Sequence, residues 1–469
     1  MTSERLSALD AGFLEAEDAD RHASLAIGAV AILEGPAPEP TSFVSTIETR
    51  AQQIPRCTQV LRFHPWDLSA PEWVHDDHFD VNRHVRRAAA AQPGDDDALF
   101  RVVADIMERR LERDRPLWEC WLVDGLQDER WALVIKVHHS VADGVAASAM
   151  LAALCDDETT TGTVTPVEST SIEQRTSNGL GSFNPVNWLH GAWRASTGTA
   201  HTAWRITAGA AEIAAGILTP SPQELTGPLT DRRRYSAARM PLSEVKEICH
   251  RFDVTVNDVA LAAITDSFRE ALLRHDQPIR PTSLRTLIPV SLRSPEDLLT
   301  PDNRVSLMLP LLPIEQHDPL ARLRSVHERL STSKAGGQSQ AGAMALSASN
   351  LLPFAWTAWA VRLLARLPQR GVVTVATNVP GPKHPVSVMG RTVLSLLPIP
   401  PIAIHLRLGI AITSYADELA FGVIGEFDGS VGADEITSGI QDGLNRLVAV
   451  TRACKNSRKF RNQLLLLTS

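Results

Sequence analysis

The stretch His138-His139-Ser140-Val141-Ala142-Asp143-Gly144 joins two segments of opposite character. Residues 132–137 before it are apolar and rich in β-branched side chains, a pattern that predicts a buried strand. Residues 145–151 after it predict the first turns of a helix. A strand that ends on two histidines and runs into an Asp-Gly turn indicates a mixed α/β fold with a general base at the strand end.

The two histidines are expected to have different tasks. Neighbouring side chains of a strand point to opposite faces, so His138 and His139 face different surroundings. An imidazole accepts a proton near neutral pH and returns it later in the same reaction. Asp143 is expected to fix a tautomer or brace the loop, and Gly144 permits the turn. From the residues alone, it is also possible that the two histidines are only packed or solvated and have no catalytic role. They disfavour a metal site, because adjacent residues that face apart are poor joint ligands.

Length, charge and cysteine content limit the class of protein. The chain has 469 residues, which favours two domains of about 200 residues each. A net charge of −8 and the lack of a basic, aromatic-rich stripe argue against nucleic acid as a partner. The five cysteines form neither a disulfide framework nor a metal pattern, so a reducing cytosol is expected. The amino terminus has no signal-peptide pattern, and no run of 18 apolar residues predicts a membrane span.

The pattern divides the chain into three parts. Residues 1–155 form a first domain, with strands over 24–34 and around 121–123 and a helix over 97–112. Residues 156–231 form a linker, whose first part, 156–182, is polar and rich in Thr and Ser, and whose continuation, 186–218, predicts weakly polar, tryptophan-containing crossover helices.

Residues 232–469 form the second domain. Helices are expected from the apolar spacing around 242–248 and 261–272. Strand-like runs follow at 284–290, 305–312, 372–377, 393–397, 408–413 and 420–427. Residues 343–367 are apolar but interrupted, which fits a buried helix pair or an amphipathic face that docks on lipid.

Five motifs in order resemble one known family. The stretch 138–144 matches the HHxxxDG motif of the chloramphenicol acetyltransferase-like acyltransferases. The other four are similar to motifs of the bacterial wax ester synthase/diacylglycerol acyltransferases, and they are Ser7-Ala8-Leu9-Asp10 with Phe13-Leu14, Pro116-Leu117-Trp118, Val256-Asn257-Asp258-Val259 and Thr377-Asn378-Val379-Pro380-Gly381-Pro382. The motifs run from Ser7 to Pro382, and the resemblance as a whole covers the chain from residue 7 to about residue 450. One departure is Glu112, where the family more often has Asp.

The resemblance implies two similar α/β domains with mixed sheets and an active-site tunnel between them. It implies acyl transfer from acyl-CoA to diacylglycerol, or alternatively to a long-chain fatty alcohol as in a wax ester synthase. His139 is the expected general base, which returns its proton to the CoA sulfur, so no cofactor or metal is needed. His138 is expected to hold the strand end, and Asp143 to orient the loop, with Arg293 as a candidate partner. No GxSxG or other nucleophile motif is present, so direct transfer through a ternary complex is expected.

The remaining motifs have two interpretations each. Asn257 and Asp258 either cap a helix or place an amide across the tunnel from His139. The segment with Asn378, Pro380 and Gly381 is either a rigid turn or part of the acyl or CoA pocket. The apolar Pro116, Leu117 and Trp118 are expected in the core. A lipid acceptor implies peripheral contact with the inner face of the plasma membrane or with lipid droplets.

Three other functions fit the sequence less well. A lipid- or CoA-binding paralogue with weak activity is disfavoured by the intact His139 and Asp143. A condensation-type enzyme would need a neighbouring carrier domain, which this chain lacks. A glycerol-phosphate acyltransferase shares the spacing of His138 and Asp143 but carries a downstream Pro-Glu-Gly-Thr motif, which is absent.

Overall fold

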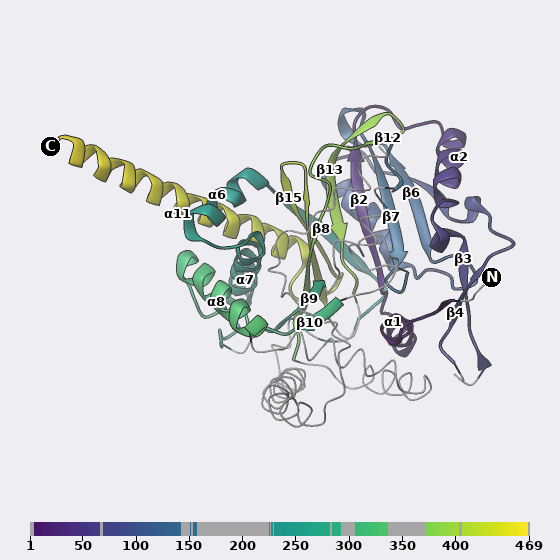
Figure 1. The fold of residues 1–469 in the computed structure, drawn as a ribbon, viewed down its shortest axis with the longest axis horizontal. Coiled ribbons are helices and arrows are strands. Elements are labelled where there is room, and N and C mark those ends of the chain that lie inside the picture. The colour runs from purple at the N-terminus through teal and green to yellow at the C-terminus, as the bar shows by residue number, and fades with distance from the viewer. Residues whose placement is uncertain are drawn as a thin grey trace, which may run out of the picture.

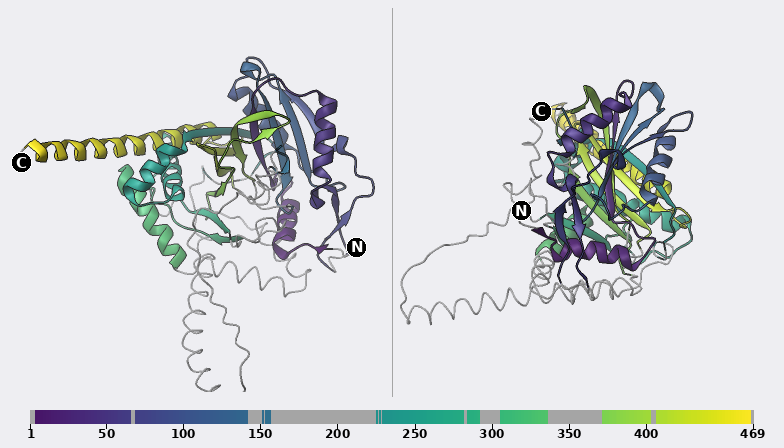
Figure 2. Two further views of the ribbon diagram at one scale, coloured as in Figure 1. Left: turned by 45° about the horizontal axis from the view of Figure 1, so that its top comes forward. Right: turned by 90° about the vertical axis from the view of Figure 1, so that its right-hand side faces the viewer.

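Two large sheets and a small one organise the described part of the chain. The computed structural model describes residues 4–65, 69–141, 151, 153–156, 225, 227, 229–281, 284–291, 305–335, 371–402 and 406–467. Both large sheets have six strands and mix parallel with antiparallel pairs, while the small sheet has three strands. The two large sheets lie side by side with helices around them (Figures 1 and 2), which confirms the expected mixed α/β class.

The first large sheet holds the strand that ends on the histidine pair. Its order is β12-β13-β2-β7-β6-β5. The strands are β2 (Ala26–Leu33), β5 (Val85–Ala89), β6 (Trp118–Asp124), β7 (Trp131–His138), β12 (Ser387–Val388) and β13 (Arg391–Ile399). All eight residues of β7 are buried, and β7 pairs with β2 on one side and β6 on the other. The strands expected at 24–34, 121–123 and 132–137 are therefore confirmed.

Three helices and the small sheet complete the first half. They are α1 (Ala8–Ala19), α2 (Pro40–Ala51), α3 (Asp96–Glu108), β1 (Glu4–Arg5), β3 (Gln59–Arg62) and β4 (Glu72–His75), with short 3-10 turns at Pro55–Thr58, Val81–Arg83 and Gln127–Glu129. Helix α3 begins on a side-chain cap from Asp95 but ends at Glu108, before the expected residue 112. The ammonium group of Lys136 in β7 donates to the carbonyls of Ile106 and Arg109, and the chain leaves the helix at Arg109 in extended geometry.

The second large sheet has the order β10-β9-β11-β14-β15-β8. Its strands are β8 (Arg233–Pro241), β9 (Thr286–Ser291), β10 (Val305–Met308), β11 (Thr374–Pro380), β14 (Leu408–Tyr415) and β15 (Glu418–Glu426), and its helices are α6 (Leu242–Phe252), α7 (Val256–Arg274), α8 (Pro319–Ala335) and α11 (Ala433–Leu467). The helices expected around 242–248 and 261–272 are confirmed. The six expected strand-like runs are confirmed as well, five of them in this sheet and the run 393–397 as β13 of the first sheet, although β10 ends four residues earlier than expected. Helix α11 packs on α7 and β8, and its end projects from the body of the protein (Figures 1 and 2).

Strand β13 crosses from the second half of the sequence into the first sheet. It pairs with β2 from Val393↔Leu33 to Ile399↔Gly28. The hydroxyl of Tyr415, at the end of β14, donates to the carbonyl of Val393 at 2.8 Å. The predicted division of the chain at residues 155 and 232 did not place β13 in the first sheet. The sequence pattern of a strand does not specify which sheet the strand joins. The exact domain boundaries stay a prediction.

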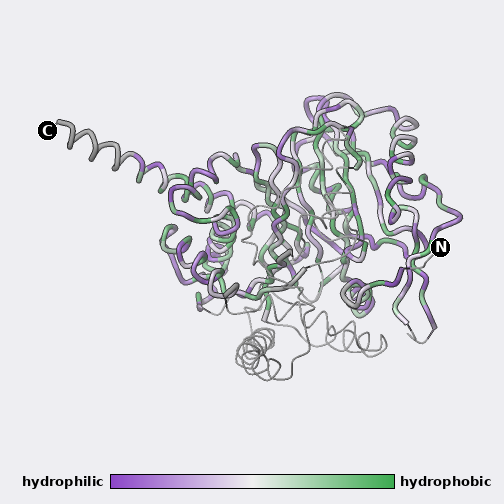
Figure 3. The backbone as a smooth tube through the Cα atoms, in the orientation of Figure 1, coloured by the Kyte–Doolittle hydropathy of each residue, from purple (hydrophilic) through white to green (hydrophobic). Residues whose placement is uncertain are grey.

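The buried apolar side chains form two main clusters, and β13 belongs to the first of them. One cluster surrounds β2, β7 and β13 with the fully buried Trp131, and it also includes Tyr235 and Ile424 of the second sheet. The other surrounds α7, β14 and β15, with Phe268 and Phe421 fully buried. The strands of both sheets are mostly hydrophobic, and the outer helices alternate between hydrophobic and hydrophilic residues (Figure 3). The first core therefore extends across the junction between the two large sheets, while the second lies within the second half.

A charged cluster ties the α helices of the second half together. The Asp266 carboxylate in α7 lies 2.5 Å from the guanidinium of Arg322 in α8. Its other oxygen accepts from Arg446 in α11 at 2.8 Å. Because the side chains of Asp266 and Arg322 are each 3% exposed, this is a buried contact that joins three helices.

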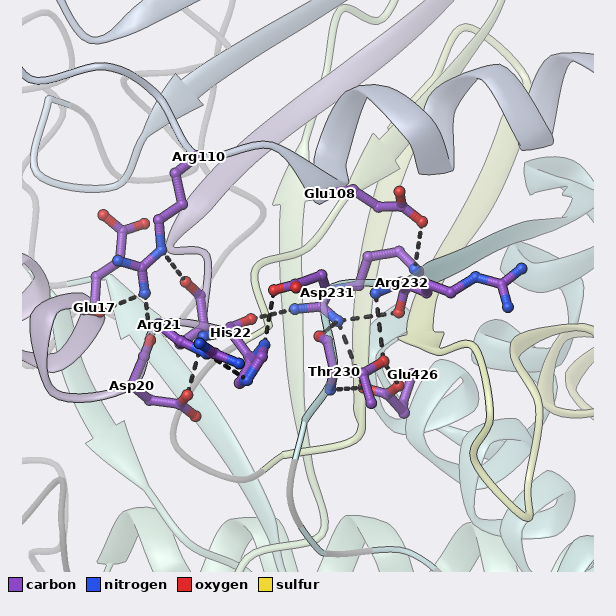
Figure 4. A network of polar contacts seen from close by, with 12 residues as sticks. Glu17, Asp20, Arg21, His22, Glu108, Arg110, Thr230, Asp231, Arg232 and Glu426 are labelled. Carbon is purple, nitrogen blue, oxygen red and sulfur yellow. Dashed lines mark hydrogen bonds and ion pairs between the residues drawn. The ribbon is translucent and has the colours of Figure 1, made fainter.

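A polar network joins the two halves near α1 (Figure 4). The Arg233 side chain, at the start of β8, donates to the carbonyl of His22 and faces Glu426 at 3.5 Å. The amide of Arg233 donates to Glu108 at 2.8 Å. Thr230 donates to the same Glu426 carboxylate through its amide at 2.8 Å. The α1–β2 loop of the first half is therefore fixed to the edge of the second sheet.

No helix in the described part of the chain is both long and apolar enough to cross a membrane. The linker 156–231 lies almost entirely outside the described residues, and the crossover helices of 186–218 and the apolar segment 343–367 lie wholly outside them.

Candidate active site

His139 follows the last residue of β7 and is held by two neighbours. Its amide donates to the Leu25 carbonyl at 2.9 Å. Its ring lies 4.4 Å from the ring of Phe13 in α1, with a tilt of 36° between the planes. The residue is half-buried, and its Nδ1 atom is buried. The imidazole is thus packed on one side and partly open, as a group that exchanges protons with a substrate has to be.

His138 has a different environment, as the alternation of strand side chains predicted. Its side chain is 2% exposed. The Ser140 amide donates to His138 Nδ1 at 3.1 Å, and the Ser140 hydroxyl lies 2.7 Å from the same nitrogen. Because Nδ1 accepts from a backbone amide, the ring proton belongs on Nε2. His138 therefore supports the strand end, in one tautomer, and is closed to solvent.

A buried carboxylate of α1 lies beneath the histidine pair. Glu17 Oε2 lies 3.5 Å from His138 Nε2, and the Glu17 side chain is 2% exposed. Oε1 accepts from the Leu25 amide at 3.0 Å, and Oε2 accepts from Arg113 at 3.0 Å. Burial on its own raises the pKa of Glu17, but the contacts with His138, Leu25 and Arg113 outweigh it and lower that pKa to about 2. Glu17 is therefore a carboxylate at any pH near neutrality.

Two arginines fix the end of α1 and the loop that follows it. Arg110 donates to the carbonyls of Glu17 and Ala23 at 2.6 and 2.9 Å, and also to that of Asp20 (Figure 4). Arg113 donates to the Leu14 carbonyl at 3.2 Å as well as to Glu17. These residues come from the segment in which Glu112 departs from the family pattern. Glu112 itself is exposed and contacts Arg115, so the departure lies away from the histidines.

Pro116, Leu117 and Trp118 are buried, which agrees with the expected core role. The Leu117 carbonyl accepts from the His138 amide at 3.0 Å. The Trp118 indole donates to the Cys57 carbonyl at 2.9 Å, and its ring stacks on His84 with 4.6 Å between centroids. This motif thus anchors the strand end from the β6 side.

Asp258 lies at the start of α7 but is not its cap. Thr255 is the N-cap, and the Asp258 carboxylate closes a capping box by accepting from the Thr255 amide at 2.8 Å. The same oxygen lies 2.8 Å from His327 Nδ1 in α8. Asp258 therefore takes part in capping the helix through the capping box, while the N-cap residue itself is Thr255, two residues before Asn257.

Asn378 and Asn257, from different motifs, meet at the start of α7. The Asn378 side-chain amide donates to Asn257 Oδ1 at 3.5 Å, a long contact, and Asn378 is exposed. Pro380 ends β11. The buried Gly381 donates to the Ser414 carbonyl at 2.9 Å, and a Cβ there would lie 2.6 Å from that oxygen. Gly381 is required by a close approach between backbones.

Gly381 lies far from the histidines. A Cβ on it would contact Leu396 at 3.5 Å. Leu396 pairs with Ala31, which pairs with Leu133, five residues before His138 in β7. At about 3.4 Å per residue, this row is about 17 Å from the strand end. The contacts of Gly381 therefore favour the rigid-turn interpretation, since they place it at the junction between the sheets.

The described residues cover only part of the expected site. Asp143, Gly144 and the candidate partner Arg293 lie outside them, as does the helix expected after residue 145. His138 and His139 are brought together with α1, and Asn257 with Asn378. In the described ranges, no three His, Cys, Asp or Glu side chains group so that they could hold a metal ion.

Glu17 was missed by sequence reasoning, and Phe13 was noted without a role. The two are four residues apart in α1, so they share one face of the helix. That spacing was visible, but an acidic residue near a helix end is usually solvated. Its burial depends on Arg113 and His138, which are distant in sequence.

Comparison with known proteins gives a consistent result. The family model of the wax ester synthase/diacylglycerol acyltransferase catalytic domain matches residues 6–260, and that of the C-terminal domain of the same family matches residues 302–448. The chain is 51% identical over 456 residues to the probable diacylglycerol O-acyltransferase tgs1 of Mycobacterium tuberculosis H37Rv, covering 97% of this chain and 98% of that protein.

Solved structures show the same fold at low identity. The wax ester synthase/diacylglycerol acyltransferase from Marinobacter aquaeolei VT8 is 23% identical with a TM-score of 0.64, and the match covers 96% of this chain and all of that one. A starter condensation domain of rhizomide synthetase RzmA, solved with C8-CoA, is 12% identical with a TM-score of 0.59, covering 96% and 95% of the two chains. These likenesses support the expected acyltransferase architecture.

Proposed function

The chain belongs to the wax ester synthase/diacylglycerol acyltransferase family, and on that premise we propose that it transfers a fatty acyl group from acyl-CoA to the hydroxyl of diacylglycerol. The product is triacylglycerol. The observation that carries the proposal is the histidine pair at the end of β7, in which His138 is enclosed and His139 is half-buried against Phe13. A relative of 51% identity that is named a diacylglycerol O-acyltransferase favours diacylglycerol over a fatty alcohol as acceptor.

His139 acts as the general base in this proposal. A hydroxyl is a weak nucleophile, so its proton is removed as the oxygen attacks the thioester carbonyl. Because His139 Nδ1 is buried, we assign Nε2 as the nitrogen that accepts the hydroxyl proton. The new O–C bond forms, the C–S bond breaks, and the imidazolium returns the proton to the departing CoA sulfur. The proton balance closes without a cofactor or metal.

Asn257 is the candidate for stabilising the negative charge that develops on the carbonyl oxygen. It occupies the first turn of α7, where the helix dipole favours negative charge. Its side-chain oxygen Oδ1 accepts from Asn378, which leaves the side-chain NH2 hydrogens of Asn257 for another acceptor. In this proposal Asp143 and Gly144 shape the loop after the histidines, and a tunnel between the two halves brings acyl-CoA and acceptor to His139 from opposite sides.

Transfer is direct in this proposal, without an acyl-enzyme. No nucleophile motif occurs in the sequence, and the buried Cys57 and Cys120 are poor nucleophiles because burial raises the pKa of each thiol. Initial rates measured against both substrates should therefore follow a sequential pattern. Parallel lines in the double-reciprocal plot would instead indicate a covalent intermediate.

Diacylglycerol reaches the protein from a lipid phase, so the proposal includes peripheral contact with the inner face of the plasma membrane or with lipid droplets. The net charge of −8 makes apolar contact more important than attraction to anionic lipid. Flotation of the purified protein with neutral phosphatidylcholine vesicles containing diacylglycerol tests this. Protein that stays at the bottom of the gradient contradicts it.

Turnover of radiolabelled palmitoyl-CoA by the purified protein tests the function. Diacylglycerol and hexadecanol are offered separately, beside a His139→Ala variant and a His78→Ala variant, which removes an exposed histidine. Triacylglycerol that is lost only with His139→Ala is the expected result. Wax ester in place of triacylglycerol would identify a fatty alcohol as the acceptor. No product with either alcohol, from folded protein that binds CoA, would indicate a lipid- or CoA-binding protein.

A further inference from the structure

One face of α1 contacts both histidines. Phe13 lies against the His139 ring, and Glu17, one helical turn later, lies against the His138 ring. The helix is itself fixed, because Arg110 and Arg113 bind carbonyl groups along its last turn and the following loop. The histidine pair therefore rests on a rigid support that includes one buried negative charge.

The two oxygens of Glu17 reach His139 by separate routes. Oε1 accepts from the Leu25 amide at 3.0 Å, and the Leu25 carbonyl in turn accepts from the His139 amide at 2.9 Å. Oε2 faces Nε2 of His138, whose other nitrogen accepts from the Ser140 amide. Glu17 thus fixes the His139 backbone through Leu25, and it fixes the neighbouring His138 ring, which in turn binds the Ser140 amide.

We propose that Glu17 is a positioning residue for acyl transfer, which fixes the His138 ring and the His139 backbone so that the His139 imidazole stays aimed at the substrate. This inference rests on the proposed function, in which His139 is the base. A buried carboxylate is costly unless it is paired, and a simple packing role would be served by an apolar side chain. Its two distinct sets of donors are what a positioning role requires.

Other charged groups near Glu17 do not replace it. Arg113 donates to Glu17 and also to Asp18, which is half exposed and has no contact with His138. Lys136 lies on β7 two residues before His138, but its ammonium group donates to the end of α3. Glu17 is therefore the carboxylate that faces the His138 ring.

A glutamine at position 17 keeps the size of the side chain and loses one acceptor. Its single oxygen can face the Leu25 amide, or it can face His138 and Arg113. In either orientation the NH2 group meets donors that it cannot bind. Glu17→Gln therefore releases one of the two routes to His139 without creating a cavity.

Kinetics of Glu17→Gln test the proposal, with Asp18→Asn as the matched control on the same helix and the same arginine. We expect kcat to fall at least tenfold while KM for palmitoyl-CoA stays within threefold, because misplacing a reacting group affects the chemical step. Asp18→Asn should keep kcat within twofold. In a His139→Ala background, Glu17→Gln should cause no further loss, because the residue acts through His139. A kcat for Glu17→Gln within twofold of wild type would overturn the proposal, as would a full additional loss without His139.

A second measurement does not depend on activity. The rate at which diethyl pyrocarbonate modifies His139, read by peptide mass spectrometry, should change at least threefold in Glu17→Gln and stay unchanged in Asp18→Asn. An unchanged rate overturns the inference. If the wild type transfers acyl groups to no alcohol, the proposed function fails, and this measurement still decides whether Glu17 positions His139.

A pair of His138 variants covers the case in which Glu17→Gln does not fold. His138→Gln keeps a polar amide near the place of Nε2, the atom that lies 3.5 Å from Glu17 Oε2, while His138→Asn retains only a group near Nδ1. We expect His138→Gln to keep at least five times the kcat of His138→Asn. Equal values, or the reverse order, would contradict a role for the Glu17 contact.

Discussion

Glu17 should make the stability of the first half depend on pH in acid. Its contacts lower the pKa from the ordinary 4.5 to about 2, so the folded state favours the ionised form. For a carboxyl whose pKa is depressed on folding, the stabilisation is present above the unfolded pKa and is lost as pH falls through the folded pKa. The stabilisation by Glu17 is therefore lost as the pH falls from about 4.5 to about 2.

The size of the effect follows from the shift. A difference of about 2.5 pKa units corresponds to about 3.4 kcal/mol at pH 6, at about 1.36 kcal/mol per unit. At pH 3.5 the same linkage leaves about 2.0 kcal/mol, so about 1.4 kcal/mol is lost between the two pH values. Because the Glu17 side chain is 2% exposed, solvent screens this interaction little.

The assay compares urea unfolding of wild type and Glu17→Gln at pH 6.0, 5.0, 4.2 and 3.5, followed by tryptophan fluorescence. The free energy of unfolding of wild type should exceed that of the variant by about 1.4 kcal/mol less at pH 3.5 than at pH 6.0. The reason is that the variant has no titrating group at this position. Asp18→Asn serves as control, and its difference from wild type should change by less than half as much. If the unfolding free energies of wild type and Glu17→Gln differ by the same amount at all four pH values, Glu17 does not have a lowered pKa in the folded protein.

Three further substitutions test the structural roles assigned above by urea unfolding, each with turnover as the second readout. Asp258→Ala removes the capping box and the contact with α8, and should cost about 1–2 kcal/mol; a loss below 0.3 kcal/mol would contradict that role. Gly381→Ala places a Cβ against the Ser414 carbonyl and should cost about 1–3 kcal/mol, whereas unchanged stability with lost turnover would instead favour a substrate-binding role. Asp266→Asn leaves two arginines without their carboxylate and should cost about 3 kcal/mol, with kcat per folded molecule within twofold of wild type; a neutral effect would show that this cluster does not hold the helices together.

The order of elements was predictable because each one carries its own periodic signal. The alternation around β7 and the apolar spacing of α7 place those elements correctly without any tertiary information. The end of α3 was missed because it depends on Lys136, a residue of another strand. The exchange of β13 into the first sheet was missed for the same reason, since pairing partners are not encoded in one strand.

The site was predictable to the extent that it lies in short motifs. His138 and His139 were assigned different environments from the alternation of strand side chains, and the structure gives them different environments. The role of Asp258 as part of a cap was visible in the spacing from Thr255, although the cap residue was not named. Glu17 could not be found, because its burial depends on residues of β7 and of the segment before β6.

In the proposed function, His139 is the base that activates the acceptor hydroxyl. The most direct test of this role is the single-turnover rate of acyl transfer from palmitoyl-CoA to diacylglycerol, at saturating substrates, in His139→Ala and in wild type. We expect a rate about 10²–10⁴ times lower in the variant, with CoA affinity unchanged and partial recovery on addition of imidazole. A rate within tenfold of wild type, in a folded variant that binds CoA normally, would contradict it.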